Sequence, residues 1–259
     1  KVIVTIKASG EYAPFTIAAA GVTVQTDDGV KATIKTEEKA RMAVTAENVT
    51  LKGLSFVSKD GKAIISGGAC DGLILDTCTF ENEKADLDNT IALYIHQPSI
   101  TVKNCTFTNW ERGYYTCGDN SAAGAITFEG NTFTNVRVPF DGYWGKPATE
   151  GTDIQIIDNK IDAGSWGTSY IQLWDYAQFG KWADWKNKDG TDWNPDGKSA
   201  LKGTVRGNTA TGGELVLYAT HCDWYTKSEI DWADQEPVYR NLIVLDGLTE
   251  DDKVTVTKT

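Results

Sequence analysis

The segments LILDTCTF (Leu73–Phe80) and ITVKNCTF (Ile100–Phe107) share one pattern, and they begin 27 residues apart. In both, apolar residues alternate with other residues, a turn-forming position follows, and Cys and Phe end the unit. Alternation with a period of two predicts a β-strand rather than a helix. The two segments therefore indicate a repeat that contains at least one strand in each unit.

The repeat extends over most of the chain. With three further strong copies, the starts of consecutive units lie 24 to 28 residues apart. A weaker copy begins 49 residues after the last strong one, and this interval is long enough for one coil plus an insertion. The further copies are VTLKGLSF (Val49–Phe56), ITFEGNTF (Ile126–Phe133) and IQIIDNKI (Ile154–Ile161), with weaker copies VTVQTDDG (Val22–Gly29) and GTVRGNTA (Gly203–Ala210). A unit this short cannot bury its own apolar face, so neighbouring units must stack.

This pattern predicts an all-β fold, a right-handed parallel β-helix (solenoid) of about 8–10 coils. We expect residues 1–259 to form one domain, with an aromatic-rich loop inserted at about 175–200. A β-sandwich is the alternative, because short strands and tight turns also suit that fold. The in-phase CTF, CTF and NTF copies favour the solenoid.

Equivalent repeat positions predict rows of stacked side chains inside the solenoid. Cys78 and Cys105 occupy one such position, and Asn131 and Asn159 continue the same row. We expect a buried row of thiols and amides, with a Cys78–Cys105 disulfide as the alternative, since adjacent coils lie about 4.8 Å apart. The Phe at the end of the units predicts a second interior row, made of Phe56, Phe80, Phe107 and Phe133.

The composition limits the partners. The formal net charge is −11, the isoelectric point is about 4.7, and five Cys and two His show no zinc-site spacing. We therefore expect no binding to nucleic acid or anionic membranes and favour a neutral ligand. The chain contains no run of about 18 apolar residues, so no membrane span is predicted. The chain begins at Lys1 without a signal peptide, so we expect a trimmed or excised, secreted or cell-surface module that is a monomer.

A second set of aligned strands predicts a surface ladder of aromatic residues. Alternation turns every second side chain outward. The expected ladder is Tyr94, Tyr115, Tyr143, Trp174 and Tyr218, with Asp141, Trp144 and Gln172 beside it. Contiguous exposed aromatic residues usually mark a binding surface.

The stretch YIQLWDYAQFGKWADWKNKDGTDWNPDGK (Tyr170–Lys198) continues from this ladder. Its Trp182 and Trp185, and Trp224 of the second aromatic loop Cys222–Trp232, are expected to form the wall of a groove. The alternative is that the insertion folds as a small lobe that caps the solenoid. Because coils recur at about 4.8 Å, close to the length of a pyranose unit, such a face suits a sugar chain.

Catalytic and metal sites are less well supported. A lyase of this fold would need acids and a base on one face, and Asp141 and Asp175 with Arg112 or Arg137 are the candidates. Hydrolase signatures of β-helix enzymes are missing, so we expect no enzyme. No cofactor is required, but DWNPDG (Asp192–Gly197) matches the start of a calcium loop. Its candidate ligands are Asp192, Asn194 and Asp196, with an acidic solvated turn as the alternative.

The stacked CTF and NTF coils, together with the aromatic insertion, resemble the β-helical domains common in gut Bacteroidota, and among them a small carbohydrate-binding module that binds xylan. The resemblance covers about residues 22–245. It implies a non-catalytic module of a multimodular enzyme of plant cell-wall degradation, which binds xylan or another neutral β-glycan through surface Trp and Tyr. A β-helical polysaccharide lyase or hydrolase is the second interpretation, and a bacterial adhesin that binds protein is the third.

Overall fold

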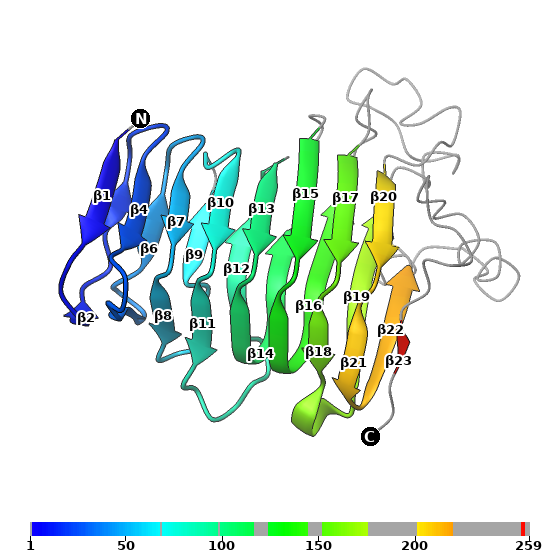
Figure 1. Ribbon diagram of the computed structural model, residues 1–259. Helices are drawn as coiled ribbons and strands as arrows, with labels where there is room; N and C mark the ends of the chain where they lie inside the picture. The colour runs from blue at the N-terminus through cyan, green and yellow to red at the C-terminus, as the bar shows by residue number, and fades with distance from the viewer. Residues whose placement is uncertain are drawn as a thin grey trace, which may run out of the picture.

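The fold is an all-β parallel solenoid, as the repeat predicts. A computed structural model describes residues 2–67, 69–97, 99–116, 124–144, 152–175, 201–219 and 255–256. Strand pairing within these residues is parallel throughout, apart from an isolated antiparallel bridge between Glu37 and Ala40. From the N-terminal end, the chain descends the near side, crosses underneath and returns on the far side, which is a right-handed winding (Figure 1).

The first sheet has eight strands, one from each coil, in sequence order along the axis. These strands are β1 (Ile3–Ile6), β4 (Thr23–Thr26), β7 (Thr50–Lys52), β10 (Leu73–Asp76), β13 (Ile100–Lys103), β15 (Gly124–Glu129), β17 (Thr152–Ile157) and β20 (Leu201–Arg206).

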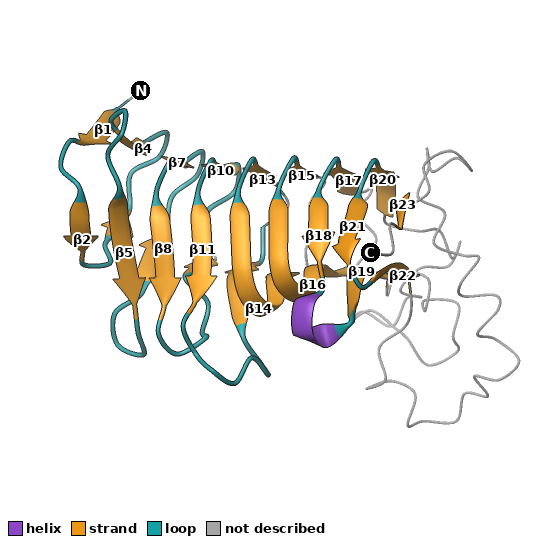
Figure 2. Cartoon of the chain, turned by 60° about the horizontal axis from the view of Figure 1, so that its bottom comes forward, coloured by secondary structure: helices purple, strands orange, loops and turns teal. Residues whose placement is uncertain are grey.

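The other fifteen strands form one sheet that folds over a corner, because β14 (Thr106–Thr116) and β16 (Thr132–Trp144) run across it. This sheet therefore has two sides, called here the second and third faces. The second face, turned forward in Figure 2, holds the starts of β14 and β16 with β2 (Gly10–Tyr12), β5 (Ala32–Thr36), β8 (Ser55–Ser58), β11 (Thr79–Asn82), β18 (Lys160–Asp162), β21 (Thr209–Gly212) and β23 (Thr255–Val256). The third face holds the ends of β14 and β16 with β3 (Thr16–Ile17), β6 (Met42–Val44), β9 (Ile65–Gly67), β12 (Ile91–Ile95), β19 (Thr168–Asp175) and β22 (Glu214–Ala219).

The register of the first sheet is the register of the sequence repeat. Leu73 pairs with Ile100, Ile100 with Ile126, Ile126 with Ile154, and Ile154 with Gly203. The 49-residue interval before the last copy therefore adds no coil to this sheet, since β17 and β20 are direct neighbours. The chain between them forms β18 and β19, which continue the same coil on the second and third faces.

The interior rows are as predicted. The rings of Phe56, Phe80, Phe107 and Phe133 stack at centroid separations of 4.8–5.2 Å. Cys78 and Cys105 are buried and free, and the Cys78 amide lies 3.4 Å from the Cys105 sulfur. The thiol row is therefore confirmed, and the disulfide is absent from this pair.

Helical structure in the described residues is a single short 3-10 turn, η1 (Gly164–Trp166), which precedes β19. In the part of the chain that the structure describes, no helix has the length and apolarity that a membrane crossing needs.

Candidate functional site

The third face brings five of the expected site residues into one row. Strand register pairs Tyr94 with Tyr115, Tyr115 with Asp141, Asp141 with Gln172, and Gln172 with Tyr218. The row therefore crosses five consecutive coils, on β12, β14, β16, β19 and β22. Neighbours in the row are one strand spacing apart, about 4.8 Å.

Tyr143 and Trp174 belong to a second row. They pair with each other, two residues further along β16 and β19, and Trp144 pairs with Asp175 one position beyond. The predicted single ladder is therefore wrong in its register: it consists of two neighbouring rows. The reason is that Asp141, and not Tyr143, lies opposite Tyr115.

The Tyr94 and Tyr115 rings stack on each other, with centroids 5.3 Å apart and planes 7° from parallel. His96 meets Tyr94 edge to face, at a centroid distance of 4.4 Å. Because stacked coils turn neighbouring rings toward one another, a ligand on the outer surface meets ring edges and hydroxyl groups here. The predicted ladder of outward aromatic residues therefore presents ring edges rather than ring faces at this pair.

A network of charged groups borders the stack. The Nε of Arg112 donates to Oδ2 of Asp141 at 2.9 Å, and its guanidinium lies over the Tyr115 ring, 5.7 Å from the centroid. Glu111 accepts from the other side of the same guanidinium, at 3.2 Å, and from the amide of Asn89. The side chain of Asp141 is completely buried although its row neighbours are on the outer surface. Asp141 therefore holds Arg112 rather than facing solvent.

Trp166 was not among the expected site residues, and Arg137 was expected only as a candidate base of a lyase. Arg137 lies 3.8 Å from Glu111 and over the Trp166 ring, 5.3 Å from its centroid. The corner at Asn135 (φ 55°) turns the chain onto the third face just before Arg137, while η1 carries Trp166. No sequence pattern joins these two residues, because they do not occupy equivalent positions of the repeat.

The two arginines of this arrangement are hydrogen-bond donors and not proton acceptors. An arginine stays protonated in proteins, and Arg112 is held between two carboxylates. Desolvation by burial raises the pKa of Tyr114, which points into the core beneath the row. Among the described residues, no group of three or more His, Cys, Asp or Glu is placed to hold a metal ion.

Several expected residues lie outside the described residues. They are Trp182, Trp185 and Trp224 of the expected groove wall, and Asp192, Asn194 and Asp196 of the expected calcium loop. The backbone of Tyr143, Trp144, Trp174 and Tyr218 is described, which fixes their row but not the direction of their side chains.

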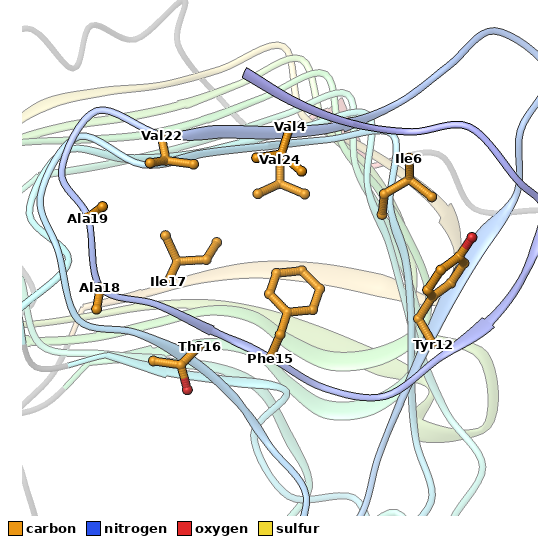
Figure 3. A pocket seen from close by; sticks show the side chains of 10 residues that line it. All are labelled: Val4, Ile6, Tyr12, Phe15, Thr16, Ile17, Ala18, Ala19, Val22 and Val24. Atoms are coloured by element: carbon orange, nitrogen blue, oxygen red, sulfur yellow. The ribbon is translucent and has the colours of Figure 1, made fainter. Parts of the chain in front are cut away.

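A second concave feature lies at the first coil, away from the third-face rows. A cavity of about 430 Å³ opens there between the first sheet and the second and third faces (Figure 3). Val4, Val22 and Val24 of its upper wall point toward Ile17 and Phe15 below. Its lining is apolar and continuous with the core, so it is the end of the solenoid interior, and it has no polar group arranged for recognition.

Scans of the sequence against protein-family models and against curated proteins found no match.

Proposed function

We propose that this chain is a non-catalytic module that binds a polysaccharide along the third face. The observation that carries the proposal is the row Tyr94, Tyr115, Asp141, Gln172 and Tyr218, one residue from each of five successive coils, in which the buried Asp141 contributes by positioning Arg112. A row that repeats at about 4.8 Å suits a ligand that repeats at a similar length. Xylan, or another neutral or near-neutral β-glycan of plant cell walls, is the ligand class.

The chemistry of the row supports a hydroxyl-rich ligand. Tyrosine edges, the Gln172 amide and the Arg112 guanidinium are hydrogen-bonding groups, and sugar hydroxyls both donate and accept. The overall charge of −11 would repel a polyanion, whereas it has little effect on a neutral chain. A protein of this kind would be secreted or on the cell surface, as part of a larger glycan-degrading protein.

Affinity electrophoresis tests the proposal. The chain is run in native gels that contain xylan, mixed-linkage glucan or mannan, and retardation by one of them is expected. Tyr94→Phe then separates two modes of binding. Recognition through ring edges and the hydroxyl group predicts reduced retardation of the variant, whereas recognition through ring faces predicts the same retardation as for the unchanged chain. Thr106→Ala, on the second face, is the control and should bind normally. Migration in all three gels at the same rate as in a gel without polysaccharide would contradict the proposal.

A polysaccharide lyase is the second candidate, because Arg112 and Asp141 contact each other on this face as such an enzyme would require. The arginine would have to act as the base, which its two carboxylate partners oppose. Absorbance of unsaturated products in the ultraviolet, measured with uronate-containing glycans, decides between the two, because β-elimination requires the carboxyl group of a uronic acid. Steady release of such products that Arg112→Gln abolishes would establish the lyase instead.

A further inference from the structure

Two arginines on the third face share one geometry. Arg112 lies over the Tyr115 ring and Arg137 over the Trp166 ring, at 5.7 and 5.3 Å from the centroids. Both contact the same oxygen, Oε1 of Glu111, at 3.2 and 3.8 Å. A guanidinium that stacks on a ring keeps its N–H groups in the plane of its fork, where they can meet a planar anion.

The charges are layered by depth. The carboxylates are inside, with side-chain exposures of 10% for Glu111 and 0% for Asp141. The guanidiniums are outside, at 26% for Arg112 and 46% for Arg137. The four charges sum to zero, but a ligand that approaches from solvent meets the cations first. On a chain of net charge −11, this cluster is neutral as a whole and cationic on its outward side.

Arg137 is the member of the pair that can take another partner. Its one carboxylate contact among the described residues is long, at 3.8 Å, while Arg112 is held at 2.9 and 3.2 Å by two carboxylates. Beside it, the buried indole Nε1 of Trp166 has no hydrogen-bond partner. A buried N–H without an acceptor is uncommon in proteins. The pair Arg137–Trp166 thus combines a half-exposed fork with a ring that supports it, since the buried Nε1 itself is not accessible from solvent.

We infer that Arg137, positioned over the Trp166 ring, is a subsite for a carboxylate carried by the polysaccharide, so that the ligand is a glycan with uronic acid substituents. This inference rests on the proposed function and narrows its substrate class. A carboxylate accepts two parallel hydrogen bonds from an arginine fork, which no neutral sugar group does equally well. Sparse uronates on a neutral backbone also fit the acidic chain, since a continuous polyanion would be repelled by the remaining surface.

The test compares one polymer in two chemical forms. Glucuronoxylan, and the same polymer after reduction of its carboxyl groups to alcohols, are cast in native gels at equal concentrations. The chain should bind the untreated polymer about tenfold more tightly, as expected for one charge-assisted contact. Arg137→Gln should remove this preference and leave binding of the reduced polymer unchanged. Arg206→Gln, which removes an exposed arginine of the first sheet, is the matched control and should keep the preference.

The outcomes are distinguishable. Equal binding of both polymers, or a preference that persists in Arg137→Gln, would overturn the subsite and leave the proposed function standing. Binding of neither polymer would overturn both. Arg137→Lys adds a test of geometry: a preference that is reduced but present indicates that the fork contributes beyond its charge. Added salt should weaken the preference and not the binding of the reduced polymer.

Discussion

Asn131, Asn159 and Asn208 show how single residues hold the interior of the later coils. Asn159 donates from Nδ2 to the Phe128 carbonyl at 3.0 Å and to Oδ1 of Asn208 at 2.8 Å. Its own Oδ1 accepts from the amide and Nδ2 of Asn131 at 3.0 and 2.9 Å. All three side chains are buried. The row therefore satisfies, from one coil to the next, polar groups that no solvent reaches.

Asn159→Ala should destabilise the protein by about 2–4 kcal/mol, because it leaves buried partners on two neighbouring coils without hydrogen bonds. Chemical denaturation monitored by circular dichroism measures this, with the exposed Thr134→Ala as the control, for which a change below about 0.5 kcal/mol is expected. Equal effects of the two substitutions would contradict the importance of the row.

Asp60 gives the stability a dependence on pH. Burial raises the pKa of its carboxyl, but hydrogen bonds from Arg41, the Lys62 amide and Ser58 outweigh this, and the pKa is lowered. A carboxyl whose pKa is lower in the native state stabilises that state above its unfolded pKa, and this contribution is lost as pH falls through the native value. Asp60→Asn should therefore cost about 1 kcal/mol at pH 7 and progressively less below about pH 4. Denaturation curves from pH 7 to 3 test it; a constant difference between the two proteins would contradict this account.

At the scale of elements, the corners between the first sheet and the second face follow a common rule. The corner residue has a positive φ in successive coils, and the residues are Gly53, Thr77, Asn104, Gly130, Asp158 and Gly207. Five of the six are Gly, Asn or Asp, which tolerate this region. Thr77, at φ 53°, is the β-branched exception. Its hydroxyl donates to the Asp76 carbonyl at 2.7 Å, on the exposed side of the corner.

Thr77→Asn should stabilise the protein by about 0.5–1 kcal/mol, because asparagine adopts the left-handed region with less steric cost. An asparagine at position 77 would lie beside Asn104 of the adjacent coil. A similar pair exists at the corner between the second and third faces, where Nδ2 of Asn135 donates to Oδ1 of Asn109 at 3.0 Å. The reverse change, Asn104→Thr, should destabilise by a similar amount. Thermal melts of both variants decide the matter, and shifts of the same sign would contradict this explanation.

The sequence repeat predicted the elements more completely than the site. The CTF and NTF copies determine the register of the first sheet, and the interior Phe row follows from them. The register of the third face could have been obtained by counting from that row. Tyr115 is eight residues after Phe107, and Asp141 is eight after Phe133, since no insertion interrupts β14 or β16. Alignment by residue type instead matched Tyr115 to Tyr143.

Other features of the site could not be read from any repeat. The stacking of Tyr94 on Tyr115 depends on side-chain rotamers, so the loss of exposed ring faces has no sequence signal. The depth of Asp141 depends on Arg112, which comes from the preceding coil. Trp166 meets Arg137 only because η1 interrupts the regular path before β19. These contacts join coils through irregular segments, where periodicity carries no information.

The whole molecule is a linear stack, so each coil contacts chiefly its two neighbours. Thr79 of β11 pairs with Thr106 of β14, and each follows a buried cysteine, Cys78 or Cys105, in an equivalent position. Residues 79–105 are therefore one full coil of 27 residues. Their removal would join Cys78 to Thr106 without changing the register of the coils on either side.

Deletion of residues 79–105 should leave a folded, shorter solenoid, whereas deletion of residues 79–98 should not, because it removes a fraction of a coil and displaces every later strand from its partner. Far-ultraviolet circular dichroism and limited proteolysis compare the two. The full-coil deletion removes Tyr94 but keeps Arg112, Tyr115 and Asp141, so it should weaken glycan binding without eliminating it. If both deletions unfold the chain, the coils cooperate beyond nearest neighbours, and the additive description of this solenoid fails. If both shortened chains fold equally well, the length of the repeat does not determine the strand register that positions the third-face rows.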